Sequence, residues 1–351
     1  MTADHEYIGP TRMAALAALG VAAFALTAGA IRAALPAPDL FEGAQKLEYL
    51  RAHPDDVTAL IVGTSSLFQG LDPNVLDPIV QETVPDFRSF NLGARSMKAF
   101  ESDKLLREAL DALDGRVKWV VLEAQHLSPV VESQYRGTLR NGDWHDLRQT
   151  WAVLRIAIEG TRAGRHWSWW IPMHVETMVS RYGNVGESER LLAALTGREP
   201  LREMTTEEIE RGRGYISIED DMGEAWRARR ERFLDEKLPV YQERVERLRE
   251  GHTVVFLDSQ LDVYREQRAF LASRGVTVLY VMPPYDMTDR FAKQLAERGE
   301  MPNLLDYADP DLYPELYAVE ARLDQGHLTR EAAVRWSERV GRDLAELLRE
   351  E

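Results

Sequence analysis

The sequence predicts an α/β protein whose parallel sheet is covered by helices on both sides, and two observations predict it. Short apolar runs rich in β-branched residues recur along the chain, as expected for strands that are buried on both faces. Helical patterns lie between these runs, and this alternation is typical of a parallel sheet. The chain has 351 residues with 44% hydrophobic side chains, enough for a large core.

Each element follows from its local pattern. The five expected strands cover residues 57–62, 87–92, 117–124, 276–284 and 303–308. The expected helices between and after them cover residues 102–113, 258–275 and 329–350. Gly275 stops the second of these helices, and Thr329 caps the third. In such sheets the functional residues lie on loops at the carboxyl ends of the strands.

A helical insertion at about 130–250 interrupts this alternation of strands and helices. It holds a charged stretch at 224–251, expected to be a solvated helix with i,i+4 ion pairs. It also holds Trp167, Trp169 and Trp170, for which lipid contact and packing onto the core are both open, and packing is favoured.

The N-terminal segment 13–31 carries no charge and is bounded by Arg12 and Arg32. Its length and composition predict a transmembrane signal anchor. The small residues at 28–30 also fit a cleaved signal peptide, and a buried soluble helix is a third reading. The expected limits are 1–12 for an N-terminal tail, 13–35 for the anchor, 36–54 for a linker, and 55–351 for the α/β domain with its insertion.

Charge excludes some functions and leaves the orientation of the anchor open. The net charge of -15 disfavours a nucleic-acid partner, because phosphate binding requires a basic face. The chain has no cysteine and therefore no disulfide or thiolate metal site. Arg12 stands alone before the anchor, whereas Arg32, Lys46 and Arg51 follow it, so the positive-inside rule does not favour an outside C-terminus.

A candidate nucleophile follows the first strand, in the segment VGTSSLFQG. Ser65 requires a base within hydrogen-bond reach and a third group that orients the base. His327 has Asp324 three residues before it, in the loop that leads into the last helix. That loop is expected at the same sheet edge as Ser65. Alternatively, Ser65 and Ser66 cap a helix, or the Asp–His pair is part of a metal site.

Two Asp-Pro pairs follow this segment, and we expect them only to start helices. Asp72 precedes Pro73, and Asp77 precedes Pro78.

The segments GTSSLFQGLDP and DQGHLT, with alternating strands between them, resemble the SGNH or GDSL hydrolases over roughly residues 55–350. The resemblance implies a three-layer α/β/α sandwich of flavodoxin-like kind. It also implies a catalytic triad in which Ser65 is the nucleophile, His327 the base and Asp324 the group that orients the base. No metal or cofactor is implied.

The resemblance also implies an oxyanion hole. Its donors would be the Ser65 amide and a second-block amide in FNLGARS, which is Ser96 by spacing from Asn91 or Gly93 by residue type. The family's third block ends in an asparagine. Here the strand ends in LEAQH, so Gln125 would have to replace that asparagine.

The implied function is that of a serine esterase or O-acyltransferase with an acyl-serine intermediate. Anchored relatives point to acetyl groups of cell-surface polysaccharides, to a membrane-bound O-acyltransferase as partner, and to an extracytoplasmic catalytic domain. A catalytically silent binding or scaffold protein of the same fold is the main alternative, because the third block is altered. A soluble lipase with a cleaved signal is a further one.

Overall fold

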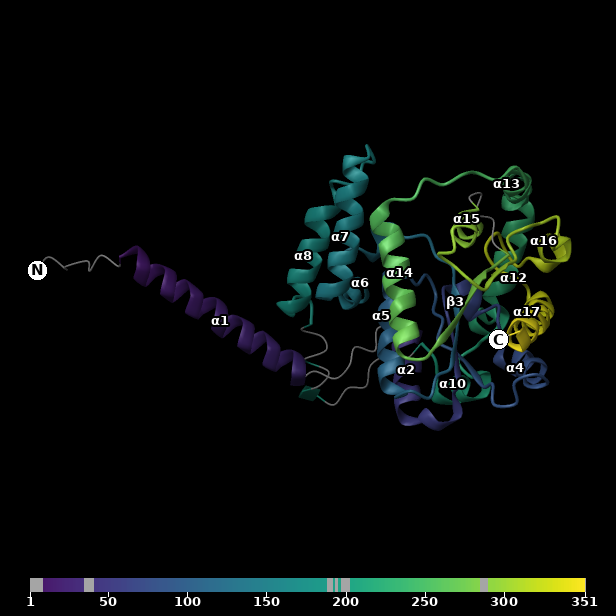
Figure 1. Cartoon of the computed structure of the whole chain (residues 1–351), viewed down its shortest axis with the longest axis horizontal. Coiled ribbons are helices and arrows are strands. Elements are labelled where there is room, and N and C mark those ends of the chain that lie inside the picture. Colours follow the sequence, from purple (N-terminus) through teal and green to yellow (C-terminus); the bar gives the residue numbers. More distant parts are fainter. Residues whose placement is uncertain are drawn as a thin grey trace, which may run out of the picture.

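The computed structural model describes residues 9–34, 41–187, 192, 195–196, 203–284 and 290–350. It shows a rounded α/β body from which one helix, α1 (Pro10–Ala34), projects (Figure 1). Residues 1–8 of the expected tail, residue 35 at the end of the expected anchor and residues 36–40 at the start of the linker lie outside the described residues.

Within the described residues, five strands form one sheet in the order β2-β1-β3-β4-β5, and every neighbouring pair is parallel. All five expected strands are confirmed, each slightly shorter than predicted. They are β1 (Ala59–Val62), β2 (Ser89–Asn91), β3 (Trp119–Glu123), β4 (Thr277–Met282) and β5 (Leu304–Asp306). Strand β1 pairs with β2 on one side and β3 on the other, so the loops after these three strands lie at one edge.

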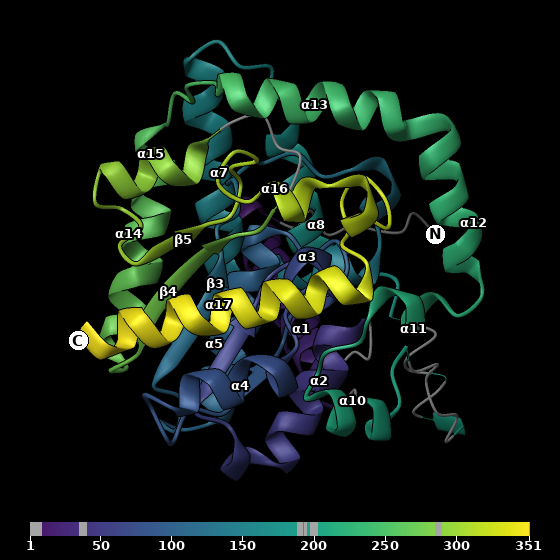
Figure 2. The ribbon, with the colours of Figure 1, turned by 90° about the vertical axis from the view of Figure 1, so that its right-hand side faces the viewer.

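The sheet buries apolar side chains on both faces. Along β1, Leu60 and Val62 belong to one apolar cluster, while Ala59 and Ile61 belong to a second. Alternation of this kind follows from the two-residue period of a strand. Helices α2 (Glu42–Ala52), α5 (Ala99–Ala112), α14 (Asp258–Ser273) and α15 (Phe291–Glu297) contribute to the first cluster. Helices α4 (Pro73–Gln81) and α17 (Arg330–Glu350) contribute to the second. Figure 2 shows α17 and α4 in front of the strands.

The three expected helices are confirmed with small shifts of their ends. They are α5 (Ala99–Ala112), α14 (Asp258–Ser273) and α17 (Arg330–Glu350). The remaining helices outside the insertion are α2 (Glu42–Ala52), α3 (Ser65–Phe68), α4 (Pro73–Gln81), α15 (Phe291–Glu297) and α16 (Pro314–Tyr317), with 3₁₀ turns at η1 (Pro54–Asp56) and η4 (Val319–Ala321).

The two Asp-Pro pairs differ. Asp72 caps α4 as expected, because its carboxylate accepts a hydrogen bond from the Asn74 amide at 2.9 Å. The same expectation is wrong for Asp77, which lies buried inside α4 and accepts hydrogen bonds from the amide and hydroxyl of Ser89. Asp77 therefore fastens α4 to β2.

The insertion is helical and divides into two groups. The first group packs against α5 and α14 and contains α6 (Leu139–Trp144), α7 (Leu147–Arg162) and α8 (Trp170–Tyr182), preceded by the 3₁₀ turn η2 (Ser133–Tyr135). The second contains α10 (Thr206–Gly212), α11 (Ile218–Met222), α12 (Ala225–Arg232), the π-turn η3 (Phe233–Lys237) and α13 (Leu238–Glu250). The charged stretch is thus split by a π-turn, where the apolar side chain of Phe233 is buried.

The tryptophans of the insertion have different surroundings. Trp170 is buried, and Trp167 lies half-buried over Gly160 of α7. Trp169 is 71% exposed. Packing therefore accounts for two of the three, and Trp169 has no such role.

Helix α1 has the dimensions of a membrane span. Its segment Pro10–Ala33 has a mean hydropathy of 2.1, and 6% of it is buried against the rest of the chain. A helix of this length can cross the hydrocarbon core of a bilayer, and a signal sequence has the same property.

Candidate active site

Strand β1 delivers Ser65 to the carboxyl edge of the sheet. The strand ends at Val62, and Thr64 caps the short helix α3, its hydroxyl accepting a hydrogen bond from the Ser66 amide at 3.2 Å. Because Thr64 caps the helix, the Ser65 hydroxyl is not needed for that purpose.

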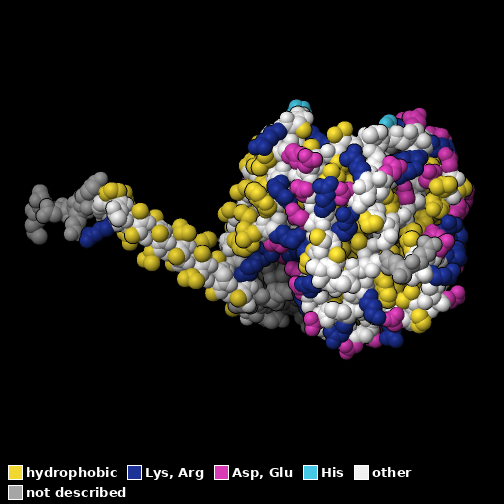
Figure 3. Space-filling model, viewed as in Figure 1, with side chains coloured by type: hydrophobic (Ala, Val, Ile, Leu, Met, Phe, Trp, Pro, Cys, Tyr) yellow, Lys and Arg dark blue, Asp and Glu magenta, His cyan; other side chains and the backbone are white. Residues whose placement is uncertain are grey.

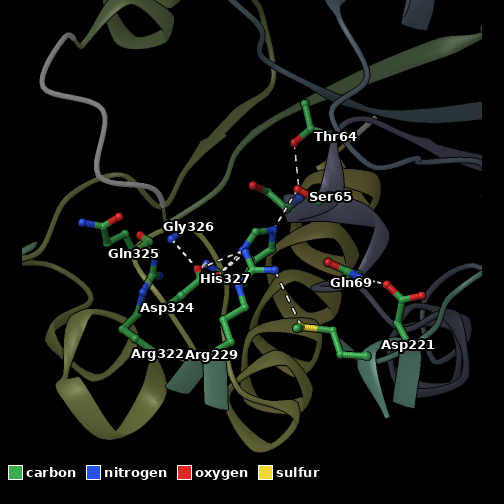
Figure 4. A network of polar contacts seen from close by, with 12 residues as sticks. Thr64, Ser65, Gln69, Asp221, Arg229, Arg322, Asp324, Gln325, Gly326 and His327 are labelled. Atoms are coloured by element: carbon green, nitrogen blue, oxygen red, sulfur yellow. Dashed lines mark hydrogen bonds and ion pairs between the residues drawn. The ribbon is translucent and has the colours of Figure 1, made fainter. Parts of the chain in front are cut away.

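Ser65, His327 and Asp324 form a continuous chain of hydrogen bonds, although 262 residues separate the serine from the histidine (Figure 4). The Ser65 hydroxyl donates to Nε2 of His327 at 2.9 Å. Nδ1 of the same ring donates to Oδ1 of Asp324 at 2.9 Å. This is the order of contacts that a serine nucleophile, its base and an orienting carboxylate require.

Asp324 is held firmly in its ionised form. Its Oδ1 accepts the backbone amides of Gly326 at 2.8 Å and His327 at 2.9 Å, and the Arg229 guanidinium forms an ion pair with Oδ2. Burial by itself would raise the pKa of Asp324. The hydrogen bond and charge of His327 and the charge of Arg229 outweigh burial and hold the pKa well below its usual range.

Arg229 lies on α12 in the insertion and is close to both Asp324 and His327. Its Nη2 lies 3.3 Å from Nδ1 of His327, but that nitrogen already directs its proton at Asp324. A guanidinium only donates hydrogen bonds, so Arg229 bonds to the carboxylate. No pattern in the sequence marks this arginine, because the contact joins a helix of the insertion to a loop 98 residues away.

Glu123 supports the loop that carries the nucleophile. It ends β3, and its carboxylate accepts hydrogen bonds from the Thr64 amide and, at 3.0 Å, from the Thr64 hydroxyl. Burial raises the pKa of Glu123 to about 7, with the Thr64 bonds opposing. A Cβ at Gly63 would lie 2.4 Å from the same carboxylate, so this glycine is required by close packing. The sequence gives no indication of this contact, because Thr64 lies 59 residues away from Glu123.

The groups expected to donate to the oxyanion differ in whether they already make other hydrogen bonds. The Gly93 amide donates to the Asn91 side chain at 3.0 Å and is therefore committed within its own loop. The Gln125 side chain lies beside Glu123, and its Oε1 accepts from the Ser102 hydroxyl at 3.3 Å, whereas its buried Nε2 makes no hydrogen bond to any residue that the structure describes. The Ser65 amide makes no hydrogen bond to any residue that the structure describes.

Ser96, the alternative second-block residue, has a backbone φ of 55°, the left-handed conformation that glycine adopts most easily. Its side chain lines a cavity of about 280 Å³ together with Phe100, Tyr135 and Trp144. The structure therefore gives Ser96 the backbone shape of a glycine at that position.

Lys46 is a further buried group that sequence reasoning missed. It lies on α2, and its Nζ donates to the Gly93 carbonyl at 2.6 Å and sits 3.6 Å from the centroid of the Phe68 ring. Burial lowers its pKa well below the ordinary value, although the Glu42 carboxylate opposes this. Phe68 is the last residue of α3, the helix that begins at Ser65. Lys46 therefore joins α2 both to α3 and to the loop that contains Gly93.

The space beside the triad is small. A cleft of about 10 Å³ is lined by residues that include Ser65, Pro284, His327 and Trp336. Such a volume holds about one water molecule, so a larger acyl group requires neighbouring side chains to move. Among the residues that the structure describes, no group of three or more His, Asp or Glu side chains could hold a metal ion.

No protein-family model matches the chain, and a search among curated proteins finds no matching relative. What the site can do therefore follows from its geometry and chemistry.

Proposed function

We propose that this protein is a serine esterase or O-acyltransferase. The observation that carries the proposal is the hydrogen-bonded chain from Ser65 through His327 to Asp324. A serine becomes a nucleophile when a base accepts its proton and a carboxylate holds that base in the productive tautomer. Both contacts are present, each at 2.9 Å.

The chemistry proceeds through an acyl-serine. Oγ of Ser65 attacks the ester carbonyl carbon while its proton passes to Nε2 of His327. The tetrahedral intermediate collapses, and His327 returns that proton to the leaving alcohol. Water or a sugar hydroxyl then attacks the acyl-serine, its proton passing to His327 and on to the Ser65 oxygen. Asp324 stabilises the imidazolium in both halves.

The developing oxyanion requires hydrogen-bond donors, and we propose the amides of Ser65 and Ser96. The Ser65 amide is free of bonds to the described residues, and Ser96 has the conformation of the glycine expected by spacing from Asn91. Gln125 would have to turn away from Glu123 and Ser102 to take part. Each missing donor lowers kcat by about 10² to 10³.

A three-layer α/β/α sandwich like that of the SGNH/GDSL hydrolases is the fold we propose. In its support, the sheet is parallel, apolar clusters lie on both faces, and Ser65 follows the first strand. Asp324 and His327 precede the last helix, as the Asp-x-x-His block does in that family.

The same proposal places the substrate at a cell surface. An apolar N-terminal helix fits a membrane anchor. Anchored members of the SGNH/GDSL hydrolases, which the chain resembles, act on acetyl groups of polysaccharides beside a membrane-bound O-acyltransferase. We therefore propose an acetylated carbohydrate or small ester as substrate, a membrane-bound O-acyltransferase as partner, and an extracytoplasmic catalytic domain.

A catalytically silent scaffold of the same fold is the second candidate. It is favoured by the committed Gly93 amide, the orientation of Gln125 and the narrow cleft. In that case the triad would be a structural remnant, and the protein would bind a polysaccharide or the acyltransferase itself.

Hydrolysis of p-nitrophenyl acetate by the purified full chain separates the two. We expect measurable activity in the wild type and a loss on the order of 10³-fold or more in Ser65→Ala. Ser66→Ala is the matched control, because its hydroxyl is one residue away and outside the triad. A fluorophosphonate probe should label Ser65. Equal inertness of wild type and Ser65→Ala, or labelling of Ser66, would remove the enzyme proposal.

A further inference from the structure

Helix α8 exposes an apolar stripe to solvent. Val175, Val179 and Tyr182 follow one another at helical spacing and are 38%, 60% and 43% exposed. On the opposite side of the same helix, Trp170 and His174 are buried against the body. An amphipathic helix normally turns its apolar side inward. Here the exposed outer side carries apolar side chains as well, and the Tyr182 ring lies 5.9 Å from the Arg181 guanidinium of the same helix.

Residues that flank α8 extend this stripe. Trp169 just before the helix is 71% exposed, and Val185 just after it is 66% exposed. Single exposed apolar residues are ordinary on protein surfaces, but several gathered around one helix are typical of an interaction site, although the exposed Glu176 lies among them. We call Trp169, Val175, Val179, Tyr182 and Val185 the α8 face.

The C-terminal end of α8 is joined to the C-terminal end of α1. Nδ2 of Asn184 donates to the Ala28 carbonyl at 2.8 Å, and Nη1 of Arg32 donates to the Arg181 carbonyl at 2.8 Å. A Cβ at Gly183 would lie 3.6 Å from the ring of Phe24. The α8 face is thus continuous with the surface of the apolar helix.

The arrangement of the two helices decides what covers the α8 face. Helix α8 is the outermost element on the side of the body from which α1 departs (Figure 1), and apolar side chains gather there in the space-filling view (Figure 3). If α1 crosses a bilayer, its C-terminal end reaches the interface. The α8 face then meets the same interface.

We infer that α8 is an interfacial helix whose exposed face rests on the lipid bilayer at the side where α1 ends. Its composition suits this position, since Trp169 and Tyr182 have amphipathic rings of the kind that gather at membrane interfaces. Aliphatic side chains of Val175 and Val179 enter the boundary between headgroups and acyl chains. A protein partner is a weaker fit, because the face is continuous with a helix that has bilayer length.

The position of α8 on the bilayer determines which way the candidate active site faces. Helix α12, which carries Arg229, and helix α17, which follows His327, lie on the side of the body opposite to α8 (Figures 1 and 2). The triad then faces the aqueous phase. As a consequence that rests on the proposed function, the substrate is a water-soluble polymer or small ester, and a membrane lipid is excluded from the site.

The absence of cysteine allows a direct test with the full chain. Single-cysteine variants Val179→Cys and Leu312→Cys are labelled with the environment-sensitive fluorophore NBD and reconstituted into vesicles of phosphatidylcholine and phosphatidylglycerol that contain spin-labelled lipid. Leu312 is the matched control, because it is 70% exposed and precedes α16 on the far side of the body. We expect several-fold stronger quenching at position 179 than at position 312.

Further positions make the result unambiguous. Leu19→Cys lies inside α1 and must be quenched if that helix spans the bilayer. Trp169→Cys repeats the test of the α8 face in case one variant misfolds. The inference is overturned if positions 169 and 179 are quenched no more than position 312, if position 19 is unquenched, or if self-quenching shows that a second copy covers the face. Hydrolysis of p-nitrophenyl acetate, measured on the same variants, reports on the proposed function separately.

Discussion

Two hydrogen-bonded clusters that contain histidine lie within the part of the chain that the structure describes, and their difference explains why one of them is a candidate for catalysis. At the sheet edge, His327 joins a carboxylate on one side and the Ser65 hydroxyl on the other. In the insertion, His145 bonds to the Asn141 carbonyl at 2.6 Å and to His174 at 2.8 Å, and His174 bonds to the Pro129 carbonyl at 2.9 Å. The second chain ends on backbone at both ends and offers no group for chemistry.

The two clusters also differ in whether a protonated, positively charged imidazole would have a carboxylate partner. Beside His327 stands Asp324, which is ionised and therefore stabilises an imidazolium. The His145–His174 pair has no such carboxylate among its contacts, and both side chains are fully buried. Each neutral imidazole has one N–H group, so the two rings can donate to only two of the three contacts. Protonation of one ring would supply the donor for the third hydrogen bond. Burial outweighs that gain. An imidazole is therefore a useful base only where its charged form has a partner.

The variant Asp324→Asn tests whether the base needs a carboxylate partner, and it has the largest expected effect on activity. The amide would leave the backbone contacts of the loop largely in place but would favour the wrong tautomer of His327. We expect a loss in kcat on the order of 10⁴-fold in the p-nitrophenyl acetate assay.

The control for this variant is Asp55→Asn, because the Asp55 side chain is 83% exposed. It should retain wild-type activity. Wild-type activity in Asp324→Asn, with its unfolding transition unchanged, would mean that the carboxylate has no part in the reaction.

Glycine substitutions separate the two regions by the kind of damage they cause. Gly63→Ala would bring a Cβ to 2.4 Å from Oε2 of Glu123, and Gly160→Ala would bring one to 2.2 Å from the Trp167 ring. Overpacking of this kind costs about 1–3 kcal/mol in the free energy of unfolding. Only Gly63→Ala also displaces the Thr64–Ser65 turn, so we expect it to lower activity by about 10²-fold as well.

Denaturant unfolding and the esterase assay measure the two effects. Gly142→Ala on α6 is the neutral control, because nothing lies within 4 Å of its added Cβ. Equal losses of activity in Gly63→Ala and Gly160→Ala would show that catalysis depends on global stability and not on the turn.

The same contrast explains what could be predicted from sequence. The strands were predictable because apolar β-branched runs have a strong local signal. The meeting of Ser65 and His327 followed from topology, since parallel strands bring their carboxyl ends to one edge. Arg229 and Glu123 were not predictable in their roles, because each acts through a contact with a distant loop.

The insertion was predictable only as helical. Its α6–α8 group is held by contacts such as the His145–His174 bond, which joins residues 29 positions apart and carries no periodic signal. The exposure of Trp169 beside the buried Trp170 likewise depends on how α8 is rotated, and neighbouring tryptophans give no indication of that.

Between about pH 4.5 and 6.5, the pH dependence of stability has opposite signs for the histidine pair and for Glu123 at the sheet edge. Burial lowers the pKa of His145 from 6.5 to about 3 and that of His174 from 6.5 to about 4. The unfolded chain therefore binds more protons below pH 6.5 than the folded chain, and stability is lost as the pH falls from there toward 4. At the sheet edge, burial raises the pKa of Glu123 from 4.5 to about 7, so the folded chain binds more protons and stability is lost as the pH rises through that window.

Replacement of the histidine pair should therefore change the slope of stability against pH. The variant His145→Gln/His174→Gln keeps polar side chains at both positions but removes the gain in stability between pH 4.5 and 6.5. That gain is about 2 kcal/mol per histidine. Denaturant unfolding across this range should show a variant whose stability rises less with pH than that of the wild type, or falls. His53→Gln, at an exposed position, should keep the wild-type slope. An unchanged slope in the double variant would mean that the pair is charged in the folded chain, and the contrast with His327 drawn above would be wrong.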